Sequence, residues 1–498
     1  MKKWKWIHKW FSLVTSFLLI LWAFSGIILN HRQLLSEVDI NRSLLPKNYQ
    51  LKNWNLSSLK SSCTLSEDSI LLYGNIGIKL SDKYLTHFTP FVNGLEKGID
   101  NRKVYKIYKT QSGRILAAIQ TGLYVFDPSI NEWEKVFSEE NDARMIDIAE
   151  HNGYIIALSR SHVYRINEKN GLFQINKVFL PASINDRGTI SLFRTLWVIH
   201  SGEIIGFTGQ LFVDFMALAI IFLSLTGFIY FFFPKWMKHR KSQQKNIIRL
   251  ASINKFTIKW HNHIGIWIGI FLIFTTLTGM FLRPPLLLTI AKSMVGKIPH
   301  SILSDPNSWN DRLRVIQWDK ISNQWIIGTS DGFYELDENF ARPAIPFSIQ
   351  PPLSVMGINV FENDSEGNYL VGSFNGLFIW NPNSNSVTDY FTAKSVDFTN
   401  ISGSPIGNNM IAGMATINNQ KIIIDYNKGA IGNFIPMPEK VAETPISLWN
   451  VALEIHTARI FESIIGILYI LIIPLLGLAT LLILISGAVV WFRKRKKK

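Results

Sequence analysis

Cysteine is nearly absent from this chain, since Cys63 is the only one among 498 residues. One thiol cannot form an intramolecular disulfide, and it cannot supply a cysteine-ligated zinc or iron–sulfur site. The sequence also has no Cys-x-x-Cys-His motif, so covalent attachment of a c-type haem is excluded.

Acidic residues are missing from three basic segments, residues 1–9, 234–259 and 493–498, although the whole chain carries a net charge of +15. These segments hold 18 of the 51 Lys and Arg residues, and the rest of the chain has 33 basic and 36 acidic residues. The positive charge is therefore concentrated beside apolar runs, which is typical of cytoplasmic membrane flanks. We expect no nucleic-acid partner.

Four long apolar runs are present, at residues 10–30, 209–233, 264–282 and 464–492. Each is long enough to cross roughly 30 Å of hydrocarbon at about 1.5 Å per residue. The positive-inside rule places both chain ends in the cytoplasm and the two long polar segments outside. The first run begins like a signal peptide, but it is longer and lacks a small-residue cleavage site, so we expect a retained anchor.

The runs divide the chain into eight segments. Their predicted order is TM helix 1 (1–33), external β segment 1 (34–198), TM helix 2 (199–234), a basic cytoplasmic loop (235–259), TM helix 3 (260–283), external β segment 2 (284–450), TM helix 4 (451–492) and a basic cytoplasmic tail (493–498). Both halves follow one plan, which implies pseudo-two-fold symmetry. We therefore expect a membrane α-helical four-helix bundle of two pseudo-symmetric halves.

Polar residues recur in register in the two halves. Aligning Ser25-Gly26 with Thr278-Gly279 places His8 and His261 each 18 positions before the glycine. Small residues followed by glycine are common where membrane helices pack closely, but the shared histidine spacing is additional. The first and third spans are therefore predicted to be equivalent.

The second and fourth spans show the same kind of recurrence. Ile199-His200-Ser201 is similar to Ile455-His456-Thr457, and each later span contains a small residue followed by glycine, Thr226-Gly227 and Ser486-Gly487. The spacing from histidine to glycine differs by four residues. The fourth span is therefore either longer or begins with an extra turn.

Short alternating strands and tight turns dominate both external segments. Gly-aromatic strands that end in an Asp or Asn turn follow apolar runs at residues 122–128, 332–337 and 376–382. This is the pattern of an antiparallel meander. A spacing of about 40–50 residues per unit fits propeller blades, so the two segments together predict a large all-β, propeller-like domain of about seven or eight blades. Two open β domains facing each other are the alternative.

Six histidines lie at the ends of the apolar runs: His8, His31, His200, His261, His263 and His456. A helix rising about 1.5 Å per residue separates His8 from His31 by roughly 35 Å, so they belong to opposite membrane faces. The positive-inside topology then sorts the six, with three on the cytoplasmic side (His8, His261 and His263) and three on the external side (His31, His200 and His456).

Each face thus has histidines from different helices, which is the requirement for bis-imidazole ligation of a haem inside a helical bundle. Two such haems, one near each face, would form an electron path across the membrane. The alternative is that these histidines are ordinary polar groups at helix ends.

Charged residues near the external face have two interpretations each. Arg283 and Arg459, like Arg32, either pair with haem propionates or anchor to lipid headgroups. Asp214 lies within the second span, where an unpaired carboxylate costs several kcal/mol, so it either relays a proton or binds a neighbouring helix.

The segments Ile7–Gly26 and Trp260–Gly279 and the two Ile-His-(Ser/Thr) starts resemble the PepSY-associated transmembrane helix family. That family consists of bacterial inner-membrane proteins and includes di-haem ferric-siderophore reductases. The resemblance implies b-type haem (heme b) held by His8, His261, His200 and His456, with His31 as a further external ligand. It also implies one-electron reduction of ferric chelates in the periplasm. No clear PepSY unit is found in the external segments.

The sequence therefore predicts an inner-membrane b-type haem oxidoreductase, with two haems, that contacts membrane lipid. Its electron donor is expected to be cytoplasmic or a quinol, and its acceptor a periplasmic ferric siderophore or another iron chelate. The alternative is a non-enzymatic, membrane-anchored β-propeller that senses a periplasmic ligand or binds a partner. A permease is disfavoured because four unbroken spans leave only a narrow path.

Overall fold

The computed structural model describes residues 2–140, 142–169, 172–354, 357–364, 366–396, 407–432 and 436–495. The chain divides into two compact units. The helical unit combines residues 1–35, 188–305 and 448–498, and the β unit combines residues 36–187 and 306–447. Each unit is thus assembled from segments that lie far apart in the sequence.

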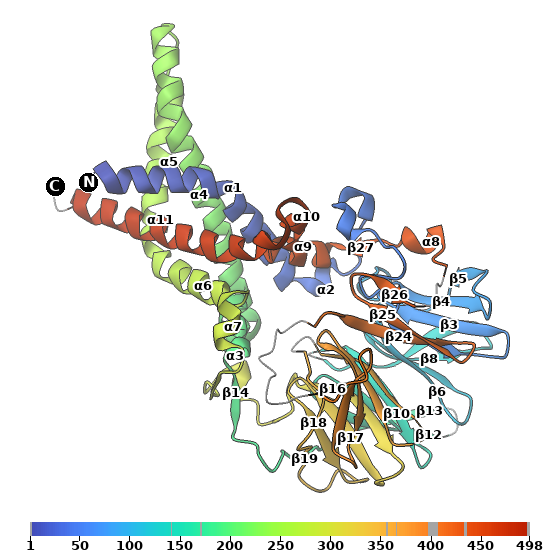
Figure 1. Ribbon diagram of the computed structural model, residues 1–498. Helices are drawn as coiled ribbons and strands as arrows, with labels where there is room; N and C mark the ends of the chain where they lie inside the picture. Colours follow the sequence, from blue (N-terminus) through green and yellow to red (C-terminus); the bar gives the residue numbers. More distant parts are fainter. Residues whose placement is uncertain are drawn as a thin grey trace. The chain divides into compact units, whose positions relative to one another are not determined.

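Three helices of the helical unit are long and apolar enough to cross a membrane: α1 (Lys2–Asn30), α4 (Gly206–Ser242) and α11 (Ile472–Arg495). Helix α1 packs on α4 and on α11, and the first turns of α1 lie beside the second half of α11 (Figure 1). The predicted third span is divided between α5 (Ile248–Trp267) and α6 (Gly269–Phe281), which are bent by 61° relative to each other. It counts as a fourth candidate span only if this bent pair is one span.

The break in the third span is not expected from its unbroken hydropathy. It falls at Ile268, between Trp267 and Gly269. Glycine at the start of α6 weakens the helix, because it has the largest backbone entropy to lose. Ile268 still donates its backbone N–H to the Ile264 carbonyl, so the chain bends at little cost in hydrogen bonding.

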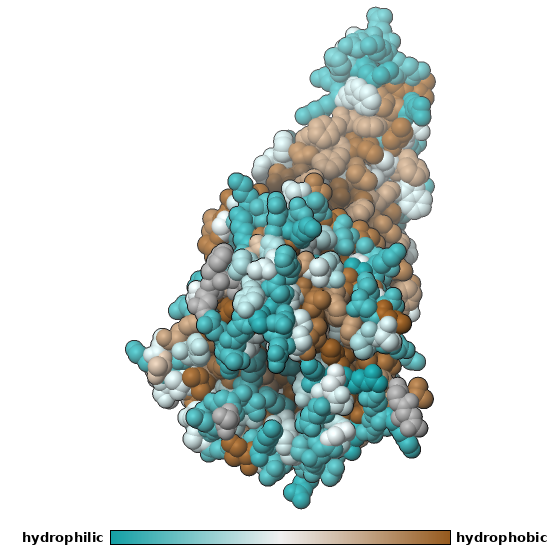
Figure 2. Space-filling model, turned by 90° about the vertical axis from the view of Figure 1, so that its right-hand side faces the viewer, coloured by the Kyte–Doolittle hydropathy of each residue, from teal (hydrophilic) through white to brown (hydrophobic). Residues whose placement is uncertain are grey.

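The basic segment expected to be a loop, residues 235–259, is largely helical. Helix α4 continues to Ser242 and α5 begins at Ile248, so only five residues connect them. Lys and Arg are good helix formers, and those in the last turn of α4 also interact favourably with its macrodipole. Helices α4 and α5 thus form a helical hairpin. Hydrophobic residues cover the middle of this hairpin, and hydrophilic residues cover its tip (Figure 2).

Two short helices precede the second and fourth spans, α3 (Leu192–Ser201) and α9 (Leu448–His456). A residue in the left-handed region follows each of them, Gly202 with φ 83° and Ala458 with φ 61°. A short 3-10 turn comes next in both halves, η3 (Glu203–Ile205) and η5 (Arg459–Phe461). The backbone before the second span and the backbone before the fourth span therefore follow the same course as far as the end of these 3-10 turns.

The four-residue offset between the halves is one extra helical turn. Gly206 starts α4 with φ 67° and ψ −150°, and Gly466 has the matching values of 57° and −146°. In the second half the four residues of α10 (Glu462–Ile465) stand before this glycine, and the six-residue turn η6 (Gly466–Leu471) leads into α11. The extra turn, rather than a longer α11, accounts for the spacing.

The β unit consists of antiparallel sheets. Its first segment forms three of them, with strands β2 (Ser61–Thr64), β3 (Ser69–Gly74), β4 (Gly77–Asp82), β5 (Phe88–Pro90); β6 (Val104–Lys109), β7 (Ile115–Ile119), β8 (Gly122–Asp127), β9 (Glu132–Phe137); and β10 (Met145–His151), β11 (Tyr154–Ser159), β12 (Val163–Lys169), β13 (Leu172–Val178).

The second segment forms three more sheets. Their strands are β16 (Leu313–Asp319), β17 (Gln324–Thr329), β18 (Phe333–Leu336), β19 (Ile345–Pro346); β20 (Ile358–Asn363), β21 (Tyr369–Ser373), β22 (Gly376–Asn381), β23 (Ser386–Asp389); and β24 (Ile411–Ile417), β25 (Gln420–Asp425), β26 (Gly429–Ile431). The two-stranded pairs β1 (Asp39–Ile40) with β27 (Ile446–Ser447) and β14 (Thr189–Ser191) with β15 (Met294–Gly296) complete the strands of the described residues.

Hydrophobic clusters join the six larger sheets in a cyclic order. Each sheet packs on the next one along the chain, and the last packs on the first through a cluster that includes Trp54 and Ile424. The first strands of successive sheets contact one another, so they line the inside of this arrangement. The structure confirms apolar membrane helices and a large antiparallel β domain. The described residues form six such sheets, fewer than the seven or eight expected.

Five of these inner strands carry a β-bulge near their first residue. The bulged residues are Tyr105, Ile146, Arg314, Asn359 and Ala412. A bulge re-aims a side chain and interrupts regular pairing, which protects an unpaired strand edge.

Candidate functional site

The structure brings four of the six predicted histidines together as two pairs. His8 of α1 and His261 of α5 have ring centroids 6.1 Å apart and ring planes at 81°. His200 of α3 and His456 of α9 are also 6.1 Å apart, with ring planes at 55°. These are the two repeat-related pairs, here called the first pair and the second pair.

Three of the four rings lie against a backbone carbonyl of another helix in the same way. The Nδ1 atom of His8 is 3.0 Å from the Ile483 oxygen, that of His200 is 2.9 Å from the Thr275 oxygen, and that of His456 is 3.1 Å from the Trp22 oxygen. His261 Nδ1 is 2.9 Å from the Thr226 hydroxyl, and the Leu223 carbonyl is a further partner.

A buried hydroxyl residue three positions after each carbonyl lies beside the same Nδ1. The distances are 3.4 Å for Ser486, 3.3 Å for Thr278, 3.0 Å for Ser25 and 2.9 Å for Thr226. Each hydroxyl also donates its own hydrogen to that carbonyl. Because a carbonyl oxygen can only accept a hydrogen bond, the imidazole Nδ1 is the donor to it, and the hydroxyl oxygen can accept from the same N–H.

At three of the four sites, the glycine after the hydroxyl residue gives the histidine ring its space. A Cβ atom at Gly279 would lie 2.6 Å from His200 Cε1, one at Gly487 would lie 3.0 Å from His8 Cε1, and one at Gly26 would lie 3.3 Å from His456 Cε1. At Gly227, the glycine after Thr226, a Cβ would meet no atom within 4 Å. The Ser/Thr-Gly pairs found in the sequence are thus seats for histidines of other helices.

The carbonyl and hydroxyl partners of Nδ1 fix the tautomer of the four imidazoles. When Nδ1–H donates to a carbonyl, the neutral ring keeps its Nε2 lone pair free, which is the tautomer that a metal ligand needs. A buried His–carbonyl bond of this kind also holds the ring plane in place. All four side chains are therefore prepared to ligate through Nε2.

The separation within each pair fits one iron ion between two rings. With a metal–nitrogen bond of about 2.0–2.1 Å and a ring nitrogen about 1.1 Å from its centroid, two opposed imidazoles would have centroids about 6.2 Å apart. Both pairs measure 6.1 Å. The described residues contain no group of three or more His, Cys, Asp or Glu side chains that could hold a metal ion.

Charged groups surround the second pair. Arg283 interacts electrostatically with His456 and with Arg459, and Arg459 forms an ion pair with Glu454 at 3.2 Å. The Trp22 Nε1 atom is buried and has no hydrogen-bond partner among the described residues. These groups provide the cationic and donor surroundings that a propionate requires.

His31 lies in a separate polar cluster between α1 and α4. Its Nε2 atom is 2.7 Å from Asp214 Oδ2, and Asn30 donates to Asp214 Oδ1 at 2.8 Å. Of the two interpretations for this buried carboxylate, the structure shows the binding of a neighbouring helix. His31 is thus engaged with Asp214 rather than paired with another histidine.

His263 is exposed on α5, and its Nδ1 atom bonds to the Lys259 carbonyl of the same helix at 2.8 Å. It therefore does not join the first pair.

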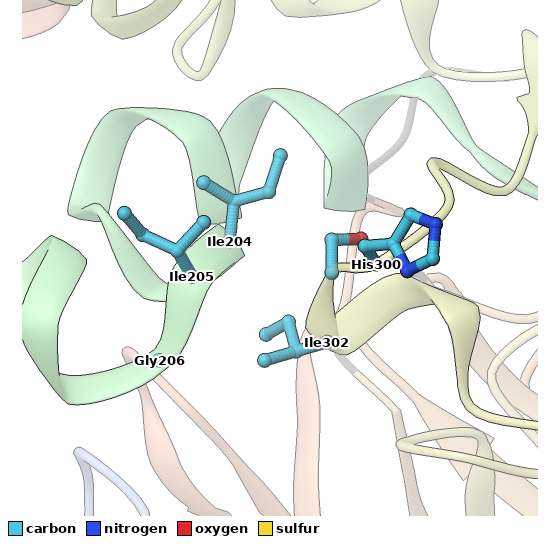
Figure 3. A pocket seen from close by; sticks show the side chains of 6 residues that line it. Ile204, Ile205, Gly206, His300 and Ile302 are labelled. Carbon is cyan, nitrogen blue, oxygen red and sulfur yellow. The ribbon is translucent and has the colours of Figure 1, made fainter.

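The helical unit also contains an open pocket of about 420 Å³, lined by Ile204, Ile205, Gly206, His300, Ser301 and Ile302 (Figure 3). Its walls are mainly isoleucine side chains, and His300 is its one titratable lining residue. None of the four paired histidines lines it.

The apolar helices identify a membrane protein. The sequence model of the PepSY-associated TM region matches residues 115–494, which is more than half of the chain. The chain therefore belongs to this family, as its histidine and glycine spacing predicted. No curated protein matches the chain.

Several solved structures are similar to the chain at a low level. The extracellular domain of a putative hybrid two-component system from B. thetaiotaomicron is 12% identical, with 76% of this chain and 39% of that chain covered and a TM-score of 0.33. The β-propeller domain of Cps50 (Swd1) from Myceliophteria thermophila is 7% identical, with 78% and 88% covered and a TM-score of 0.33. PorZ of Porphyromonas gingivalis is 10% identical, with 76% and 32% covered and a TM-score of 0.30.

Proposed function

We propose that this protein is an inner-membrane b-type haem oxidoreductase that passes electrons across the membrane to a ferric chelate in the periplasm. The observation that carries the proposal is the pair of matching histidine sites, each with centroids 6.1 Å apart and Nδ1 committed to hydrogen bonding. In this proposal α1, α4, α11 and the bent α5–α6 pair form a four-helix membrane bundle.

The two sites would each hold one haem. His8 and His261 would be the axial ligands near the cytoplasmic face, and His200 and His456 those near the periplasmic face. Haem supplies reversible one-electron redox chemistry when it is bound. The chain's part is to keep the four Nε2 atoms unprotonated and to hold the rings rigidly on their Ser/Thr-Gly seats.

Arg283, Arg459 and the Trp22 indole would bind propionates at the periplasmic site. Arg283 and Trp22 Nε1 are suited to this role, because one is a cation and the other a buried donor with no described partner. A charge-assisted hydrogen bond from guanidinium to carboxylate is stronger than a neutral one.

Helix α1 connects the two sites. It carries His8 of the first pair near its start and, 18 residues later, Gly26, which seats His456 of the second pair. That stretch of helix rises about 27 Å, which is close to the hydrocarbon thickness of a bilayer. Electrons entering at one face, from a cytoplasmic or quinol donor, would thus leave at the other.

The six cyclically packed sheets are proposed to be the blades of a periplasmic propeller. Propeller domains commonly present ligand or partner surfaces at the ends of their central channel. Such a domain would dock the iron chelate or an accessory partner. Siderophore reduction for iron acquisition is the proposed use of the electrons.

Absorption spectroscopy tests the proposal. Full-length protein purified from haem-replete cells should show a dithionite-reducible b-type spectrum with two haems per chain. The double variant His200→Ala with His456→Ala should retain one haem, and His263→Ala, which removes an exposed histidine of α5, should retain both. Colourless wild-type protein would overturn the proposal and favour the non-enzymatic scaffold.

A further inference from the structure

Three arginines converge at one end of two neighbouring sheets in the β unit. Arg144 directly precedes β10, and Arg160 directly follows β11, whose last residue Ser159 pairs with Met145. Arg314 is the bulged residue of β16, and the Leu313 backbone N–H donates to the Arg160 carbonyl at 2.9 Å. The three side chains act on one another electrostatically.

Two of the three arginines have a carboxylate partner within ion-pair distance. Arg144 Nη2 is 2.8 Å from Asp142 Oδ2, and Arg160 Nε is 2.6 Å from Asp311 Oδ1. Arg314 instead donates to two backbone carbonyls, at 2.9 Å and 2.7 Å. The neighbouring Arg312 forms an ion pair with Asp331.

Donor atoms in this cluster lack acceptors among the described residues. Arg144 Nε is buried without a hydrogen-bond partner, and the Nε and Nη2 atoms of Arg314 have no described acceptor either. A buried donor without a partner is destabilising, and more so when the group is charged. A purely structural brace would not require such a surplus of donors.

The surroundings of Arg314 and Arg160 also disfavour the charged form of their guanidinium groups when no anion is bound. Burial, together with repulsion by Arg160 and Arg144, lowers the pKa of the Arg314 guanidinium to about 9. Burial likewise lowers the pKa of Arg160. A nearby negative charge would reverse both effects, because it favours the protonated form.

The cluster is accessible to a small solute. The side chains of Arg144 and Arg160 are 20% and 26% exposed, and those of Asp142 and Asp311 are 37% and 32% exposed. The phenol of Tyr105, the bulged residue of β6, acts electrostatically on both Arg144 and Arg160. Residues from three adjacent inner strands thus border one polar site.

We infer that Arg144, Arg160 and Arg314 form a binding site for the carboxylate group of a small organic anion. A guanidinium matches a carboxylate through two parallel hydrogen bonds. The ligand class is therefore a hydroxycarboxylate or a chelate that presents a carboxylate, and the bulge in β16 is the feature that aims Arg314 at it.

Isothermal titration calorimetry of the full-length protein in detergent, with citrate at pH 7 and low ionic strength, tests this site. Saturable citrate binding is expected, and Arg314→Gln should weaken it at least tenfold. Arg114→Gln is the matched control, because it removes one arginine of an exposed pair with Glu168 in the same unit. This control should bind citrate as the wild type does.

Three results would overturn the inference: no saturable binding of citrate, unchanged affinity in Arg314→Gln, or tighter binding of inorganic phosphate than of citrate. If Arg314→Gln does not fold, Arg314→Lys provides the comparison, since it keeps the charge but not the two-pronged geometry and should still weaken binding. Thermal unfolding of each variant separates misfolding from lost affinity. The titration does not depend on haem, so its failure would leave the haem proposal untouched.

Discussion

The two histidine pairs have the same internal geometry but different surroundings. Both have ring centroids 6.1 Å apart, and in both each Nδ1 is held by a Ser/Thr-Gly seat on another helix. The groups that act electrostatically on His261 are His8 and a backbone carbonyl, whereas His456 also faces Arg283. In the proposed haem sites, the shared features would fix the tautomer of the ligands, and the differing ones would tune the redox potential.

The helices that carry the pairs also differ. The first pair lies on the long helices α1 and α5, and the second on the short helices α3 and α9, where His456 is the last helical residue and His200 the second to last. The second site is thus built at the breaks that precede two spans. We expect it to be the more sensitive of the two to local changes in packing.

Replacing a glycine by alanine should give the largest difference in haem content between the two histidine sites. Gly279→Ala places a Cβ 2.6 Å from His200 Cε1, so the ring must leave its seat, and the variant should lose the second haem and keep one per chain. Gly227→Ala on the first site meets no atom within 4 Å and should keep two. Haem content per chain measures this, and equal loss in both variants would contradict it.

Removing the positive charge of Arg283 beside the second pair should change the midpoint potential of the second haem and leave that of the first unchanged. Arg283→Gln takes away a cation that opposes the more positive, oxidised iron, so the midpoint potential of the second haem should fall by tens of millivolts. Redox titration followed by absorption resolves the two haems. A shift of the first haem, or a rise of the second, would be inconsistent with the proposed assignment.

Removing the hydroxyl group beside a histidine should weaken haem retention to a different degree at the two sites. His261 is 2.9 Å from the Thr226 hydroxyl, whereas His200 is 2.9 Å from a carbonyl and 3.3 Å from the Thr278 hydroxyl. A hydrogen bond of this type contributes about 0.5–1.5 kcal/mol. Thr226→Ala should therefore weaken haem retention at the first site more than Thr278→Ala does at the second, as measured by haem loss to apomyoglobin. The reverse order would contradict the described seats.

The smallest effect on haem is expected from His31. His31→Ala removes the partner of Asp214 and should lower the free energy of unfolding by about 1–3 kcal/mol, because a buried carboxylate loses a hydrogen bond. Both haems should remain, since His31 is engaged with Asp214 and not with the second pair. Loss of one haem in this variant would instead make His31 a ligand.

The repeat in the sequence is sufficient to select the four paired histidines. Equal spacing of His8 and His261 from a glycine, and the shared surroundings of His200 and His456, distinguish them from the other histidines of the chain. The same pattern leaves out His263, which proves to be exposed. It does not reveal that three of the four glycines, Gly26, Gly279 and Gly487, lie against the histidine of another helix, because that contact joins residues up to 479 positions apart, as in His8 and Gly487.

Other features leave no signal in the sequence. The bend at Ile268 lies within continuous apolar residues, and the helical continuation of the basic segment has the composition of a loop or a helix alike. The arginine cluster combines residues 144, 160 and 314, each of which has the local pattern of an ordinary turn or strand end. Only the side-by-side packing of β10 and β16 brings them together.

Hydrophobic length and residue spacing are enough to define the apolar spans, the repeat, the antiparallel β character of the two long polar segments and the histidines that recur in register. These are properties of order along the chain. Packing in three dimensions is needed to select which carbonyl and hydroxyl hold each imidazole, how six sheets pack in cyclic order, and where three guanidiniums meet two carboxylates. Those outcomes depend on distances between segments that the chain brings together only when apolar surfaces are buried.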